Sequence, residues 1–156
     1  GEHSSPHTTA VVVHGLQVAV KNDVALVPGV LKRGIDWLTI YQTNSVQYLK
    51  NHAIKDSEER RKKITRSYAG NLDALVFMIL TDAGHVNAAM RDFLYRDRQH
   101  LSAYGKAVFG LALHAQGQKE KLDMILLFRS ISHRCYPLGV EKKPKTEKKL
   151  KTVSMK

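Results

Sequence analysis

The stretch that most constrains the fold is residues 101–118, LSAYGKAVFGLALHAQGQ. From Ala103 to Leu113 its one strongly polar side chain is Lys106, and apolar side chains occupy every side of a 3.6-residue turn. A helix that is apolar all round is normally buried all round. Ser102 suits the N-cap, and Gly117 suits a left-handed C-cap. The stretch therefore predicts a core helix without chemistry of its own.

Two glycines in this stretch are costly in a helix interior. Gly105 and Gly110 each disfavour the helix by about 1 kcal/mol relative to alanine. We expect them where neighbouring backbones come close.

Five further segments have helical patterns. Residues 9–20 are apolar on nearly every face, and the Ser5–Pro6 pair suits a helix start. Residues 29–53 are amphipathic, with Gln42 on the face expected to meet solvent. Residues 43–45 are a weak point of this helix, where a bend or break is expected. Residues 71–83 are again apolar, with Asn71 as the expected N-cap and Gly84 as the stop.

Two amphipathic helices complete the series. Asn87 is expected to cap the helix AAMRDFLYRDR, which directs Met90, Phe93 and Leu94 inward. Residues 119–128 follow with Leu122, Ile125 and Leu126 on one side. Apolar and amphipathic helices therefore alternate three times along the chain.

The three apolar segments share a loose pattern. Ala10, Val12 and Leu16 fall 64 residues before Ala74, Val76 and Leu80, and these fall 33 residues before Ala107, Phe109 and Leu113. Repeated hairpins of inner and outer helices stack into two-layer arrays. We expect three hairpins with seven buried core residues: Val12, Leu16, Leu75, Leu80, Val108, Leu111 and Ala112.

Composition is that of one folded unit with a basic end. The 156 residues are 43% hydrophobic, enough for a real core, and no apolar run approaches the roughly 20 residues of a membrane span. The formal net charge is +11: residues 129–156 contribute +7 and residues 1–128 contribute +4. The single Cys135 excludes an internal disulfide framework. Since Gly1–Glu2 is an unusual natural start, we interpret the chain as a piece of a longer protein.

Catalytic and metal signatures are weak. His3 and His7 are four residues apart, but they straddle the expected helix start and do not form a metal motif. His14 and His114 interrupt apolar helices and are interpreted as core or rim histidines. Asp73 and Asp82 would project from different faces, so they do not suggest an acid/base pair. Ser4 and Ser5 have no glycine elbow around them. We predict no enzyme activity, cofactor or metal site.

Several segments in order resemble a known family. SPHTTAVVVHGLQVA, VPGVLKRGIDWL, NLDALVFMILTDAG and LSAYGKAVFGLALHAQGQ are similar to the thioester domain of the α2-macroglobulin and complement family, in its bacterial branch. The resemblance covers roughly residues 1–124. It implies an all-α fold, an α/α toroid of six helical hairpins, of which this chain would hold about half. The expected domains are a partial toroid domain at 1–128 and a basic tail at 129–156.

The resemblance also implies a function for the parent protein. Family members trap proteinases: a bait region is cut, the molecule rearranges, and a Cys–Gln thioester captures a nucleophile. The motif Cys-x-Glu-Gln is absent here, because Tyr136, Pro137 and Leu138 follow Cys135. His52 falls where complement proteins have an assisting histidine, but NHAIKD does not match that pattern. The parent would be periplasmic or secreted, with proteinases as partners, and this chain would self-associate through open toroid edges.

A second hypothesis is a basic helical module that binds nucleic acid or another polyanion. It would use residues 60–63, RRKK, within the charge run 55–67, and the tail. These runs lack the interleaved aromatic residues that stack on bases, so this hypothesis ranks second. A solvated connector explains the charge run more simply.

Overall fold

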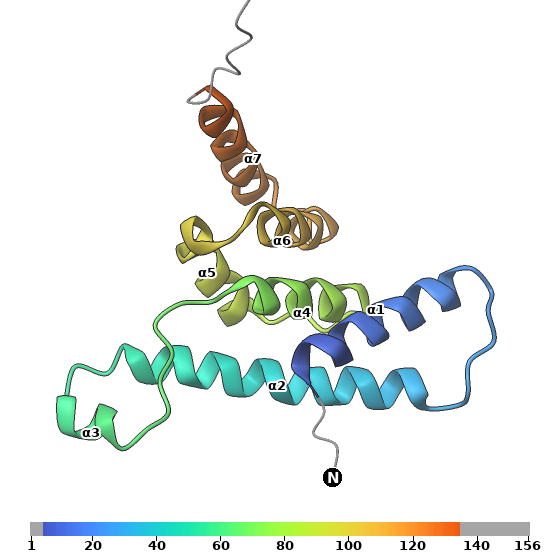
Figure 1. The fold of residues 1–156 in the computed structure, drawn as a ribbon, viewed down its shortest axis with the longest axis horizontal. Helices are drawn as coiled ribbons and strands as arrows, with labels where there is room; N and C mark the ends of the chain where they lie inside the picture. The colour runs from blue at the N-terminus through green and yellow to red at the C-terminus, as the bar shows by residue number, and fades with distance from the viewer. Residues whose placement is uncertain (1–4, 135–156) are drawn as a thin grey trace, which may run out of the picture.

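The chain folds as a set of helices, in agreement with the all-α prediction. The computed structural model describes the backbone of residues 5–134 and the side chains of residues 5–126, and it contains no strand in that range. The helices are α1 (Pro6–Lys21), α2 (Val30–His52), α3 (Ser57–Arg61), α4 (Asn71–Asp82), α5 (Ala88–Arg96), a 3₁₀ turn (Arg98–His100), α6 (Ala103–Ala115) and α7 (Lys119–Arg134) (Figure 1).

Local signals place most helix ends correctly. The side chains of Asn87 and Ser102 accept hydrogen bonds from the Met90 and Gly105 amides, so both are N-caps as predicted. Pro6 occupies the first turn of α1 after Ser5. Gly84 and Gly117 follow α4 and α6 with φ of 82° and 67°, a left-handed conformation that glycine adopts without strain.

Helix α4 lies at the centre of the molecule. It packs against α6 on one side and against α1 and α2 on the other, with α5 also in contact (Figure 1). Eight consecutive residues of α4, Asp73 to Leu80, are buried. Phe77 meets Phe109 of α6 edge to face, with ring centroids 5.9 Å apart. The all-round apolar pattern of residues 71–83 is thus explained by neighbours on every side.

Each apolar helix packs against the amphipathic helix that follows it: α1 against α2, α4 against α5, and α6 against α7. A neighbour does approach Gly105 closely, but it is a side chain and not the expected backbone: a β-carbon there would lie 2.2 Å from the Asn71 side-chain oxygen. At Gly110 the nearest atom, a methyl group of Leu122, lies at 3.4 Å, so that site is less tight.

Two predicted core residues are wrong. Leu75, Leu80, Val108 and Ala112 are buried and Leu16 is half-buried, but Val12 is 53% exposed and Leu111 is 60% exposed. Helices α1 and α6 lie on opposite sides of α4, and each has one face that no described element covers (Figure 1). An apolar face therefore does not ensure burial at the edge of a helical array.

Two expectations for helix α2 are wrong. Gln42 is 3% exposed, because it falls on the same stripe as Leu38 and Leu49. The expected weak point at residues 43–45 is absent, and α2 runs unbroken to His52. The hydroxyl of Thr43 donates to the Thr39 carbonyl at 2.8 Å, and Ser45 is buried, so polar side chains are accommodated within the helix.

Further corrections concern α4 and α7. Gly70, not Asn71, is the N-cap residue of α4. Ile125 is buried and Leu122 half-buried, but Leu126 is 54% exposed, and α7 continues past the expected end at Phe128 to Arg134. Cys135 and the remainder of the predicted tail lie outside the described residues.

Candidate functional site

Ion pairs concentrate where the 62–70 connector meets the start of α4. Asp73 is 2% exposed, and its Oδ2 accepts hydrogen bonds from Arg66 Nη2 at 2.6 Å and from the Gly70 amide at 2.7 Å. Its Oδ1 finds no hydrogen-bond partner among the described residues. A carboxylate in the first turn also interacts favourably with the helix dipole. Asp73 therefore anchors the connector to α4.

Asp97 makes a second anchor beside the first. Its carboxylate accepts from the Ala69 amide at 2.8 Å and from the Arg96 side chain at 2.6 and 2.8 Å. Burial acts to raise the pKa of Asp97, but the hydrogen bonds from Arg96 and the Ala69 amide hold this pKa below its usual range. Neither anchor was predicted from the sequence. A carboxylate between two arginines, in YRDR, was the available signal for the second one.

The two carboxylates considered as an acid/base pair lie at opposite ends of α4. Asp73 is in its first turn with Arg66, and Asp82 is in its last turn, 3.3 Å from the Lys21 ammonium. Each has its own cation as a partner. The two carboxylates are therefore not placed to act together as an acid/base pair.

The candidate histidines remain separate from one another. His7, His52 and His114 are exposed, whereas His14 is half-buried and its Nδ1 finds no partner among the described residues. Among the side chains that the structure describes, those of residues 5–126, no group of three His, Cys, Asp or Glu is placed to hold a metal ion. His3 and Ser4 lie outside the described residues, and the side chain of Ser5 caps nothing.

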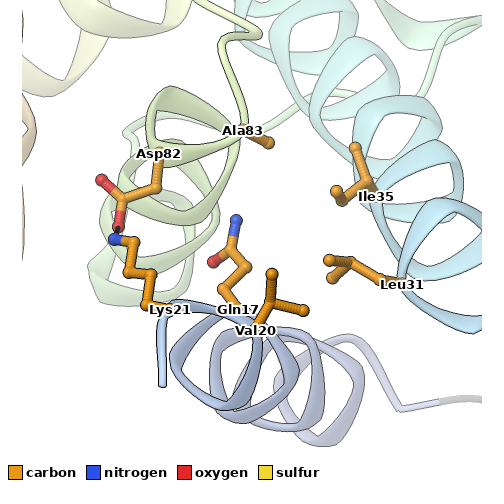
Figure 2. Close-up of a pocket in the computed structure, with 7 residues that line it drawn as sticks. All are labelled: Gln17, Val20, Lys21, Leu31, Ile35, Asp82 and Ala83. Atoms are coloured by element: carbon orange, nitrogen blue, oxygen red, sulfur yellow. Dashed lines mark hydrogen bonds and ion pairs between the residues drawn. The ribbon is translucent and has the colours of Figure 1, made fainter. Parts of the chain in front are cut away.

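A pocket of about 210 Å³ lies where α1, α2 and α4 meet (Figure 2). Val20, Leu31, Ile35 and Ala83 give it apolar walls, and the Lys21–Asp82 ion pair lies at one side. Gln17 contributes the buried polar group: its Nε2 donates to the Ile79 carbonyl at 2.9 Å, and its Oε1 finds no partner among the described residues. That oxygen is itself buried, and Lys21 and Asp82 are paired with each other, so the pocket offers a ligand little polar recognition.

The charge run of residues 55–67 is partly neutralised by its own acidic residues. Arg61 pairs with Glu58 at 3.4 Å, and the Lys63 ammonium pairs with Glu59 at 2.5 Å. The Arg60 guanidinium donates to the Ile54 carbonyl at 3.4 Å. Asp56 caps the short helix α3 within this segment. The charge run thus forms local ion pairs on the surface rather than a concentrated cationic patch.

The largest unexplained features are two uncharged helix faces. The α1 outer face comprises Val11, Val12, Gly15 and Val18, and all four are exposed. The α6 outer face comprises Tyr104, Ala107, Leu111 and Ala115, again all exposed. The members of each face recur at helical spacing, so each face forms one continuous strip. Contiguous exposed apolar strips typically mark interaction surfaces.

Searches for similar proteins give no independent guide to these faces. Neither the family models, nor the curated proteins, nor the solved structures compared with the chain gave a match. No helix in the described part of the chain has the length and hydropathy needed to cross a bilayer.

Proposed function

We propose that this chain is a non-catalytic part of an α2-macroglobulin-like proteinase inhibitor, in which it builds about half of the ring of helical hairpins. The parent protein would trap proteinases, and this segment would supply rigid inner and outer helices. On this proposal the parent is a bacterial protein of the periplasm or the extracellular space. The family resemblance of the sequence is the basis for the parent's activity.

One structural observation carries the proposal. The apolar helices α1, α4 and α6 each pack on the amphipathic helix that follows them, and α4 separates α6 from α1 (Figure 1). An array of inner helices would continue at both ends, where the α1 and α6 outer faces lie exposed. Stacked repeats bury their apolar faces against neighbouring repeats, so exposed end faces are expected of an incomplete array.

A structural role also agrees with the state of the polar residues. The buried carboxylates Asp73 and Asp97 hold the connector in place through Arg66 and the Ala69 amide. His52, in the region of the assisting histidine of complement proteins, is exposed in the last turn of α2. Without Cys-x-Glu-Gln in the sequence, the chain has no acyl group to transfer.

The proposal is tested on the parent and on this chain separately. The gene upstream of Gly1 should encode Cys-x-Glu-Gln, and the parent should form a trypsin adduct that methylamine pretreatment abolishes. The 156-residue chain alone should form no adduct visible on denaturing electrophoresis. A methylamine-sensitive adduct at Cys135 would contradict the non-catalytic role, and a parent without trapping activity would contradict the family assignment.

The polyanion-binding hypothesis remains the alternative. Its support is the net charge of +11, to which residues 129–156 contribute most. Against it, Arg61 and Lys63 are paired with Glu58 and Glu59. Binding to duplex DNA should fall steeply between low and physiological salt if phosphate contacts carry it. We expect no binding at physiological salt.

A further inference from the structure

Two contacts, one at each end, define the register in which α4 packs against α6. At one end the Asn71 side-chain oxygen accepts from the Ser102 amide at 2.9 Å and lies against Gly105. At the other end Gln116 Nε2 donates to the Thr81 hydroxyl at 3.0 Å. The strip of α4 from Asn71 through Met78 to Thr81 therefore faces the strip of α6 from Gly105 through Phe109 to Gln116.

The internal sequence pattern relates each of these two packed strips to one of the two exposed outer faces. Moving 33 residues along the chain takes Ala74 to Ala107 and Leu80 to Leu113, so it also takes Met78 to Leu111. Met78 is 5% exposed beneath its neighbours, whereas Leu111 is 60% exposed. The α6 outer face is thus the counterpart of the α4 strip that receives α6.

The same comparison identifies the α1 outer face. Val12, Val76 and Phe109 occupy equivalent positions in the pattern. Val76 and Phe109 are fully buried, whereas Val12 is 53% exposed. Val12 at the centre of the α1 outer face therefore corresponds to Phe109 in the α6 strip that docks on α4.

We infer that the α1 outer face of one copy of this chain docks on the α6 outer face of a second copy, as α6 docks on α4 within one copy. Helices α1 and α6 lie on opposite sides of α4 (Figure 1), and their outer faces are exposed, so the contact is head to tail and leaves a free face at each end. This inference uses the helix array alone and does not depend on proteinase trapping.

Shape and charge favour this pairing over like-with-like contacts. The α1 outer face projects three valines, and the α6 outer face alternates the larger Tyr104 and Leu111 with Ala107 and Ala115. Projecting side chains of one helix pack into gaps between those of the other. Neither face contains Asp, Glu, Lys or Arg, so no charge is buried without a partner.

The size of the faces sets the expected affinity. Helices of 16 and 13 residues are about 24 and 20 Å long at ~1.5 Å per residue. We expect one helix-on-helix contact of that length to bury less than the ~1,200 Å² below which interfaces are weak and transient. We therefore expect association that depends on concentration in the micromolar to sub-millimolar range.

Sedimentation velocity on the full chain, from about 10 to 500 μM, tests the inference. The wild type should progress beyond a dimer as concentration rises, because each added copy presents another free face. Val12→Glu and Leu111→Glu should each be monomeric throughout. Ile40→Glu is the matched control: Ile40 is 63% exposed on α2, outside both faces, and its substitution should leave association unchanged.

Mixing the two blocked variants is the decisive experiment. Val12→Glu keeps an intact α6 outer face and Leu111→Glu keeps an intact α1 outer face, so an equimolar mixture should form a heterodimer and nothing larger. Three results would overturn the inference: a monomeric wild type at about 500 μM, association that survives either substitution, or a mixture that stays monomeric. Circular dichroism melts verify folding, and Val12→Thr with Leu111→Gln serves as a gentler pair if the charged variants unfold.

Discussion

The side-chain oxygen of Asn71 ties the first turn of α4 to the first turn of α6, since it accepts from both the amide and the hydroxyl of Ser102, at 2.9 and 3.1 Å. A β-carbon on Gly105 would lie 2.2 Å from this oxygen. One polar side chain therefore sets how closely the two most extensively packed helices approach at this end.

Gly105→Ala should destabilise the protein despite the better helix propensity of alanine. Displacing Asn71 from Ser102 should cost more than the ~1 kcal/mol of propensity gained, for a net loss of about 1–2 kcal/mol in the free energy of unfolding. Urea denaturation measures it. Gly15→Ala is the control, because nothing lies within 4 Å of a β-carbon there, and it should stabilise by about 0.5–1 kcal/mol.

A double substitution identifies the cause. In an Asn71→Ala background the obstructing oxygen is gone, so Gly105→Ala should become neutral or stabilising. Equal effects of Gly105→Ala in both backgrounds would mean that the Asn71 contact does not limit the approach of α4 and α6.

Asp97→Asn should weaken the protein most at neutral pH. The folded-state pKa of Asp97 lies below its unfolded value near 3.8, so its contribution is fully present above that value and is lost as pH falls through the folded pKa. We expect the variant to lose about 1–3 kcal/mol at pH 7, from weakened hydrogen bonds to Arg96 and the Ala69 amide. Urea titrations from pH 7 down to about 2.5 measure this difference.

The wild type and the Asp97→Asn variant should converge as the solution is acidified below about pH 3.8. The reason is that protonated Asp97, like asparagine, carries no charge. A stability difference that stays constant down to the lowest pH would show that the Asp97 charge contributes nothing.

Asp73→Ala should be among the most damaging polar substitutions. It removes the acceptor of the Arg66 guanidinium and the Gly70 amide at a buried site, and we expect a loss of about 2–3 kcal/mol. Thermal melts with Asp36→Ala as control measure it. Asp36 forms an exposed pair with Lys32, so its removal should cost at most about 0.5 kcal/mol. Equal losses would contradict an anchoring role for Asp73.

Gln17→Met should be close to neutral despite the burial of Gln17. The substitution loses the hydrogen bond to the Ile79 carbonyl, but that carbonyl also accepts from the Ala83 amide at 3.2 Å. It also removes the unpartnered buried Oε1, whose desolvation is unfavourable. Chemical denaturation should show a change within about 1 kcal/mol. A larger loss would indicate that Gln17 positions α1 on α4.

The sequence by itself determined the positions of the six longer helices and most of their ends, but it did not predict the short helix α3 within the charge run. Asn87 and Ser102 act as N-caps, and Gly84 and Gly117 end helices in the left-handed conformation. These are local effects, because a cap or a positive φ depends on residues within one turn. The alternation of apolar and amphipathic helices likewise predicted the all-α class.

The sequence could not determine which of several apolar faces would be covered. Val12 and Val76 occupy equivalent positions in similar helices, yet Val76 is fully buried and Val12 is 53% exposed. The polar side chain of Gln42 predicts the solvent-facing side of α2, although its spacing from Leu38 and Leu49 places it on the buried stripe. In each case burial depends on where distant helices come to lie.

Only the tertiary structure decided where the edges of the helical array fall. Helix α4 has neighbours on all sides, whereas α1 and α6 each have one side that the described helices leave open. It also decided that Asn71 binds Ser102, 31 residues away, instead of capping its own helix. The physical reason is the same in both cases: hydrophobic pattern and capping chemistry act within a helix, but burial and long-range hydrogen bonds require a partner that only the packed chain brings into place.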